Sequence, residues 1–119
     1  MNSGPRYPAS AEADPALSEI REVIAQEVAR AGYRLDALYL FGSRARGEQR
    51  PDSDWDFYVA VDRLLSFAER SRIASRIRWR LAHMDLTADV FVQSAEEMRR
   101  HRDDTGRLAY YVLRSGRRI

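Results

Sequence analysis

Two aspartates near the middle of the chain, Asp54 and Asp56, have the spacing of a metal-binding pair. They open a stretch that alternates as a strand does, Asp54 to Val61, and residues two apart on a strand point to the same face. The two carboxylates would therefore project side by side, with Trp55 between them facing the core. Adjacent carboxylates repel each other, and one of them normally takes up a proton. A divalent cation removes that cost, and Mg²⁺ is commonly held by one or two carboxylates together with substrate phosphates.

A third acid, Asp89, lies inside an apolar stretch, Leu86 to Val92, that predicts another strand. A carboxylate in such a setting needs a compensating partner. If this strand neighbours the one that begins at Asp54, Asp89 completes a three-carboxylate cluster. It could then bind a second metal or act as the base for an attacking hydroxyl. The alternatives are a strand-edge acid paired with an arginine and, for Asp54 and Asp56, two solvated acids at a turn.

Gly42 and Ser43 could hold phosphate. They follow an apolar run, Leu35 to Phe41, that predicts a buried strand, and they precede a short helix at residues 44–47. Such a turn exposes backbone N–H groups, glycine permits close approach, and the Ser43 hydroxyl adds a donor. The alternative is that Ser43 serves only the turn. Phosphate donors beside a metal-binding acid pair are the parts that phosphoryl or nucleotidyl transfer requires.

Three arginines lie between the Gly-Ser pair and the acid pair. Arg44, Arg46 and Arg50 could neutralise a phosphate tail, because the guanidinium group suits bidentate phosphate recognition. For Arg44 and Arg46, structural ion pairs are the alternative.

The string FGSRARGEQRPDSDWDFYV, which contains these residues, resembles the core signature of the minimal nucleotidyltransferases of the DNA polymerase β superfamily. The resemblance implies that Gly42 and Ser43 contact nucleotide phosphates, and that Asp54 and Asp56 bind the metal. By order along the chain, the family's third acid maps to Asp89. The order of helices and strands extends the resemblance to about residues 15–116.

The resemblance also implies a biological role. Stand-alone proteins of this size are similar to the antitoxins of toxin–antitoxin pairs whose toxin is a helical HEPN-type ribonuclease. The implied reaction is Mg²⁺-dependent transfer of AMP from ATP to a tyrosine of that toxin. Two alternatives remain: a non-catalytic antitoxin that neutralises its toxin by binding, and transfer to a small molecule or an RNA end with a second subunit.

Composition excludes several other chemistries. The chain has 119 residues, and all 20 of its basic residues are arginine, so there is no lysine nucleophile, Schiff base or P-loop lysine. The absence of cysteine excludes disulfides, thiolate zinc sites and a cysteine nucleophile. A net charge of +2 does not by itself predict nucleic-acid binding. No apolar run predicts a membrane span or a signal peptide, so the expected location is the cytoplasm. The sequence leaves open whether the protein forms a homo-oligomer.

These residues require a fold that brings strand ends together. We expect a flexible tail at residues 1–13 and a single nucleotidyltransferase domain at residues 14–119, of the α/β (α+β) class with a small mixed sheet flanked by helices. A first helix is predicted to begin at Pro15, with Asp14 as its N-cap, and to end at Gly32. Its apolar face consists of Leu17, Ile20, Ile24, Val28 and Ala31. A second helix is predicted from Asp62, as its cap, to about His83, with Leu64 and Phe67 near its start. Another helix should follow the capping box of Ser94 and Glu97. The last is predicted at Leu108 to Leu113, with Gly116 as the stop.

One further pattern lies outside the candidate site. Arg72, Arg76 and Arg80 recur every four residues and form a basic stripe on the second predicted helix. The stripe is either solvated, paired with acids elsewhere in the fold, or a surface on which a protein partner docks.

Overall fold

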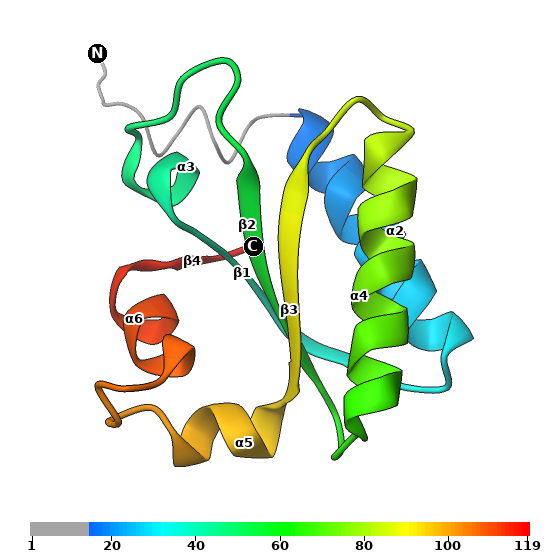
Figure 1. The fold of residues 1–119 in the computed structure, drawn as a ribbon, viewed down its shortest axis with the longest axis vertical. Helices are drawn as coiled ribbons and strands as arrows, with labels where there is room; N and C mark the ends of the chain where they lie inside the picture. Colours follow the sequence, from blue (N-terminus) through cyan, green and yellow to red (C-terminus); the bar gives the residue numbers. More distant parts are fainter. Residues whose placement is uncertain (1–14) are drawn as a thin grey trace.

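A four-stranded mixed sheet forms the centre of the protein in a computed structural model that describes residues 15–119 (Figure 1). The strands are β1 (Leu35–Phe41), β2 (Trp55–Val61), β3 (Ala88–Ser94) and β4 (Arg117–Arg118), in the order β3-β2-β1-β4. β1 runs antiparallel to β2 and β4, whereas β2 and β3 are parallel. The expected small mixed sheet is confirmed. The predicted tail and the Asp14 cap lie outside the described residues.

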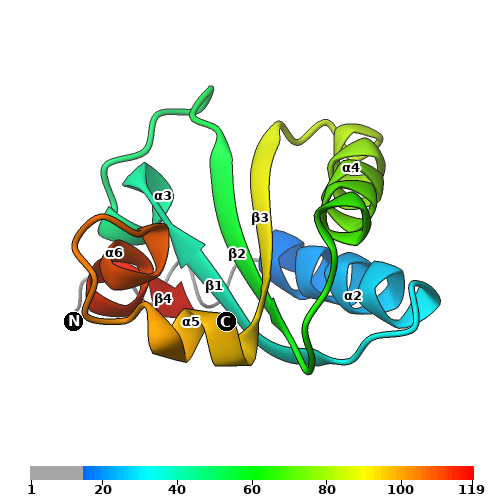
Figure 2. The ribbon, with the colours of Figure 1, turned by 60° about the horizontal axis from the view of Figure 1, so that its bottom comes forward.

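Helices cover both faces of this sheet. They are α2 (Pro15–Arg30), α3 (Ser43–Arg46), α4 (Phe67–Ala82), α5 (Ala95–Arg100) and α6 (Leu108–Ser115). The long helices α2 and α4 pack on one face, and the short helices α5 and α6 pack on the other (Figure 2). None of the helices in residues 15–119 is long and apolar enough to cross a bilayer.

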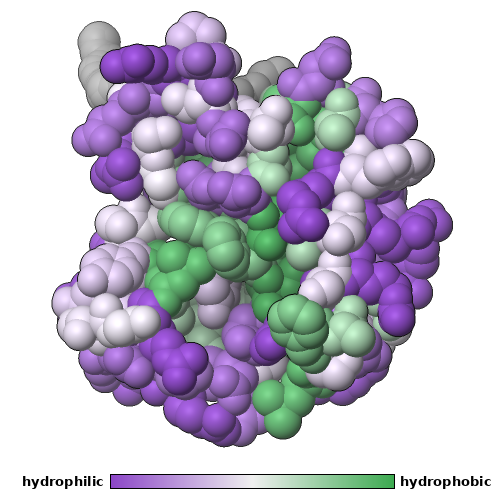
Figure 3. Space-filling model, in the orientation of Figure 1, coloured by the Kyte–Doolittle hydropathy of each residue, from purple (hydrophilic) through white to green (hydrophobic). Residues whose placement is uncertain are grey.

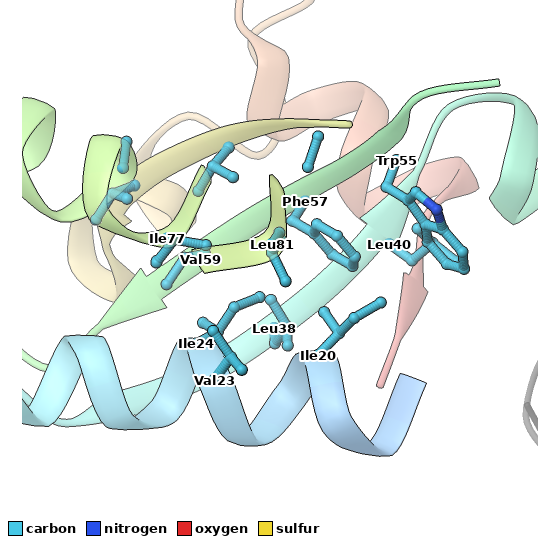
Figure 4. Close-up of a cluster of buried hydrophobic side chains, with 14 of the residues drawn as sticks. Ile20, Val23, Ile24, Leu38, Leu40, Trp55, Phe57, Val59, Ile77 and Leu81 are labelled. Carbon is cyan, nitrogen blue, oxygen red and sulfur yellow. The ribbon is translucent and has the colours of Figure 1, made fainter. Parts of the chain in front are cut away.

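The central strand β2 contributes to both apolar layers, because successive strand residues point to opposite faces. Trp55, Phe57, Val59 and Val61 face α2 and α4, as the alternation predicted. Tyr58 and Ala60 face α5 and α6. Figure 4 shows the larger cluster, where side chains from α2, α4, β1 and β2 meet; its fully buried members include Ile20, Ile24, Leu38, Leu40, Phe57, Val59, Ile77 and Leu81.

The start of α4 differs from the prediction. The helix begins at Phe67 because Ser66 forms a complete capping box: its hydroxyl accepts from the Glu69 N–H (3.1 Å), and the Glu69 carboxylate accepts from the Ser66 N–H (3.3 Å). Asp62 is not a helix cap and instead accepts from the Arg34 N–H at 2.9 Å. Leu64 and Phe67 are exposed, so they do not extend the apolar face of the helix.

Smaller differences concern three other element ends. β3 begins at Ala88, after a turn in which Asp85 adopts a φ of 62°, and continues to Ser94. The Ser94 hydroxyl accepts from the Glu97 N–H (3.0 Å) as predicted, but the Ser94 N–H donates to Gln93 Oε1, so the capping box is only half formed. Gly116 ends α6 as expected, and the strand β4 that follows was not predicted.

The basic stripe on α4 is largely a packing device. Glu27 of α2 is 2% exposed, and its two carboxylate oxygens lie 3.0 Å from Arg76 Nε and 3.0 Å from Arg80 Nη1. Burial opposes ionisation of Glu27, but the hydrogen bonds from Arg76 and Arg80, together with the positive charges of Arg30 and Arg76, hold the pKa of this carboxyl below its usual value. Pairing with an acid elsewhere in the fold is thus confirmed for these two arginines.

Candidate active site

The three predicted acids lie at one end of the sheet, where β2 and β3 both begin (Figure 1). Asp56 and Asp89 are directly opposite each other in the parallel β2–β3 register, so their side chains share the face that carries Tyr58. Asp54 immediately precedes β2, whose first residue, Trp55, is fixed by an N–H bond to the Thr87 carbonyl (2.9 Å). The expectation that the two strands are neighbours is therefore confirmed.

Asp56 is the acid most strongly affected by its surroundings. Burial raises its pKa, and the negative charges of Asp89 and Asp54 together with a hydrogen bond to Asp89 raise it further, against a weaker opposing effect of Arg46. The ionised form of Asp56 is therefore less favourable here than in an isolated aspartate. A cation bound between the carboxylates would relieve the same repulsion.

The donor set fits Mg²⁺ by its chemistry, since it offers carboxylate oxygens only. Among residues 15–119, no three acidic or imidazole side chains already converge as a closed ligand set. Asp54 and Asp89 are exposed and Asp56 is half-buried, so the two outer carboxylates face solvent beside the inner one. Mg²⁺ usually retains several waters and takes only one or two carboxylates, so the arrangement suits it; binding by Asp54, Asp56 and Asp89 stays a prediction.

Gly42 is required by a close approach to Asp56. Its φ of 76° lies in the region that favours glycine. A Cβ atom at this position would collide with Asp56 Oδ2. Gly42 also starts α3, because its carbonyl accepts from the N–H groups of Ala45 (3.1 Å) and Arg46 (3.2 Å). The turn thus places the Gly42 backbone against Asp56, and phosphate binding by Gly42 and Ser43 stays a prediction.

Arg44 holds the loop that carries Asp54. Its Nε and Nη2 donate to the Ser53 carbonyl at 3.1 and 2.8 Å, and its guanidinium lies 4.2 Å from the centroid of the Trp55 ring. Sequence reasoning did not find this structural role, because Arg44 and Trp55 are eleven residues apart and meet only where the loop folds back. Arg46 instead forms an exposed ion pair with Glu48 (2.9 Å). Phosphate contacts by Arg44 and Arg46 stay a prediction.

An aromatic pair beside the acids was also missed. Phe41 lies opposite Asp56 in the β1–β2 register, and Phe91 follows Asp89 by two residues on the same face. The two ring centroids are 5.9 Å apart, and Phe91 is 44% exposed. Because every second residue of a strand points to the same face, counting along the strand from Asp89 could have revealed that Phe91 shares the face of the acids.

Comparison with known proteins agrees with this geometry. The family model described as "Polymerase beta, Nucleotidyltransferase" matches residues 22–119. The protein adenylyltransferase MntA of Aphanizomenon flos-aquae is 44% identical over 48 residues, which cover 40% of this chain and 31% of MntA. A second relative, from Methanocaldococcus jannaschii, has a name that suggests protein adenylyltransferase activity. It is 42% identical over 48 residues, which cover 39% of this chain and 48% of that relative.

Solved structures share the fold. A toxin–antitoxin structure with AMP-PNP superposes with a TM-score of 0.56 at 23% identity, covering 82% of this chain and 69% of that one. A mutant form of the toxin–antitoxin MntA-HpeT gives a TM-score of 0.57 at 22% identity, covering 86% and 69%. The match of a family model over most of the sequence, together with the shared fold, shows that the chain belongs to the polymerase beta nucleotidyltransferase family.

Proposed function

We propose that the protein transfers a nucleoside monophosphate, AMP from ATP, to a hydroxyl group. The observation that carries this proposal is the convergence of Asp56, Asp89 and the Gly42 backbone at one end of the sheet. Like-charged carboxylates in contact there are costly unless a cation joins them. Glycine at position 42 lets the backbone of the turn, with its N–H groups as candidate phosphate donors, lie directly against the Asp56 carboxylate.

Each residue has a defined role in the proposed reaction. Gly42 and Ser43 hold the triphosphate, and Asp54 and Asp56 hold Mg²⁺, which neutralises phosphate charge when bound. Asp89 accepts the proton of the acceptor hydroxyl. The acceptor oxygen forms a bond to the α-phosphorus while the bond between that phosphorus and the oxygen bridging to the β-phosphate breaks. Pyrophosphate leaves with the electrons of the broken bond.

The proposed acceptor is a tyrosine of a HEPN-type toxin, which makes the protein a cytoplasmic antitoxin. Support comes from the names of similar proteins: a protein adenylyltransferase on one side and toxin–antitoxin structures on the other. The matched stretches span 31% and 48% of the two curated relatives, so the substrate and partner belong to the proposal.

Label transfer tests the chemistry directly. The protein is incubated with α-labelled ATP, Mg²⁺ and a candidate HEPN-type toxin, and the label on that partner is measured. Asp54→Asn combined with Asp56→Asn should abolish transfer, because it removes both charges that hold the metal. Asp52→Asn, an exposed acid in the same loop, is the matched control and should leave transfer intact.

Three outcomes would contradict the proposal. Transfer that survives the double substitution would exclude the assigned metal ligands. Silencing of the toxin in cells by the triple alanine variant of Asp54, Asp56 and Asp89 would favour neutralisation by binding alone. Label on a small molecule or an RNA end in place of the protein would identify a different acceptor.

A further inference from the structure

The outer edge of β3 has no strand paired to it in the described part of the sheet, since β3 is its terminal strand. The Trp55 N–H bonds to the Thr87 carbonyl, and in a parallel ladder the residues that face the neighbour alternate with those that face away. The backbone groups of Ala88, Val90 and Val92 therefore point away from β2. At the far end, Gln93 Oε1 accepts from the Ser94 N–H at 3.0 Å and closes the edge there.

A groove runs beside this open edge. A cavity of about 500 Å³ is bounded by Val90–Gln93 of β3, by α4 between Arg70 and Arg78, and by His101 to Ala109 on the opposite side. A second cavity of about 480 Å³ adjoins Leu86–Ala88 and shares Arg78. In Figure 3 the middle of this face is hollowed, with apolar atoms at its base and hydrophilic side chains around it. The two cavities thus follow each other along β3, one beside Val90–Gln93 and one beside Leu86–Ala88.

The walls of the larger cavity are basic. Arg70, Arg78, Arg107 and His101 line it and no acidic side chain does, whereas Asp85 lines the smaller cavity and His101 lies 3.8 Å from Glu97. Arg78 donates to the uncharged Ser75 hydroxyl at 3.1 Å, and Arg107 lies 3.6 Å from Asp104, which is itself outside the lining. Positive charge on both walls favours an occupant that carries acidic side chains.

We propose that this groove binds an acidic, extended segment of the partner polypeptide as an added strand along β3. The segment would run past Val90 toward Asp89, which is its neighbour on the strand and a member of the candidate site. The identification of the segment with the acceptor protein rests on the proposed function. Along this edge, outward N–H and C=O groups occur at alternate residues. Another peptide backbone offers hydrogen-bonding groups with the matching spacing, whereas a nucleic acid does not. A second copy of this chain would bring the arginines of both grooves together, which is unfavourable.

A peptide-binding measurement tests the groove. The probe is a labelled peptide of alternating Glu and Val, as long as the seven residues of β3, and binding to the full chain is followed by fluorescence anisotropy. Arg78→Glu and Arg107→Glu should each weaken binding roughly fivefold to tenfold. Arg72→Glu is the matched control: it makes the same charge change on the α2 side of α4, outside this groove, and should leave binding unchanged.

Backbone methylation separates strand addition from simple charge attraction. Two versions of the peptide carry N-methyl groups on alternate residues, one on every Glu and one on every Val. Only one version should lose binding, because only one set of amides faces β3. Equal binding of both versions, equal binding of a Lys-Val peptide, or no binding of the Glu-Val peptide would overturn the proposal. Displacement by a single-stranded RNA, or a dimer that Arg78→Glu dissociates, would replace it with a different occupant.

The same measurement distinguishes this inference from the proposed chemistry. The variant with Asp54→Asn and Asp56→Asn should bind the peptide as the wild-type protein does. Peptide binding without label transfer in the earlier assay would contradict the proposed reaction alone. Label transfer that is unaffected by Arg78→Glu and Arg107→Glu would contradict the groove alone.

Discussion

Asp56 is the residue on which most contacts of the candidate site converge. It is paired with Phe41 on one side and Asp89 on the other, and its carboxylate lies against the Gly42 backbone. Burial and two neighbouring negative charges raise its pKa. The folded state therefore binds the Asp56 proton more strongly than the unfolded state, and stability falls as the pH rises from the unfolded-state pKa through the raised one.

Asp56→Asn should make the protein more stable and inactive. The substitution keeps the shape of the side chain and removes the charge that opposes folding at neutral pH, so Tm should rise by a few degrees while label transfer is lost. Thermal unfolding followed by circular dichroism at neutral pH measures the shift. Asp52→Asn should change neither quantity. A lower Tm for Asp56→Asn would show that the ionised carboxylate stabilises the fold.

Gly42→Ala should destabilise the protein by about 1–3 kcal/mol, because it combines a positive φ with a collision at Asp56. Urea denaturation measures the loss. Gly106→Ala is the control, since a Cβ there would meet only Asp104 Oδ1 at 3.4 Å, an ordinary contact. Adding Asp56→Ala to Gly42→Ala should recover the part of the loss that comes from the collision. An additive double variant would exclude that contact as the cause.

At the scale of elements, the loop between α3 and β2 is positioned by one side chain. Arg44→Lys should lower the free energy of unfolding by about 1 kcal/mol, because an ammonium group cannot bond the Ser53 carbonyl with two N–H groups and stack on Trp55. Hydrogen exchange of the amides of residues 48–54 should become faster. Arg46→Lys, at an exposed ion pair, should leave both quantities unchanged. Equal effects of the two substitutions would remove Arg44 as the residue that holds the loop.

The contact between α2 and α4 depends on one buried acid. Glu27→Gln should cost about 2–3 kcal/mol, since it leaves Arg76 and Arg80 facing a neutral group in a buried position. Glu22→Gln on the exposed face of α2 is the control. Because the pKa of Glu27 is lowered, its contribution is present above the usual value of 4.5 and is lost as the pH falls through the lowered pKa. Urea denaturation at neutral and acidic pH should show the difference between Glu27→Gln and wild type disappearing in acid.

How much of the structure could be predicted depends on how local each signal is. Alternation placed Trp55, Phe57 and Val59 on the core face, because a strand's period is visible within the strand itself. The start of α4 was wrong because two residues, Asp62 and Ser66, can both cap a helix, and only the Arg34 N–H across the sheet decides which is free to do so. β4 is two residues long, too short to carry any pattern.

The candidate site divides in the same way. The Asp56–Asp89 pairing was open to prediction, since it required only that the two strands be neighbours, whereas Asp54 lies just before β2 and its shared face with Asp56 stays a prediction. The role of Arg44 depends on where the loop folds back, and that of Glu27 on a helix crossing about fifty residues away in sequence, so neither was open to local reasoning.

At the scale of the whole molecule, β2 joins the two apolar layers, so the described residues should unfold as one cooperative unit. Trp55 is 7% exposed and reports on the layer beneath α2 and α4, whereas Trp79 is 63% exposed. In Trp79→Phe, tryptophan fluorescence and far-ultraviolet circular dichroism should give coincident urea transitions. Separate midpoints would show that the two layers unfold independently.

The two edges of the sheet are treated differently by the chain. Beside β1, β4 pairs with Tyr39 and Leu40, the Ile119 N–H bonds to the Leu38 carbonyl (2.9 Å), and Arg118 Nη2 reaches the Asp36 carbonyl (3.3 Å). The sheet therefore ends in β4, only two residues long, on this side and in β3, seven residues long, on the other. A strand-adding partner can consequently pair along the full seven residues only at the β3 side, which favours a stoichiometry of one partner per chain over head-to-tail growth into a filament.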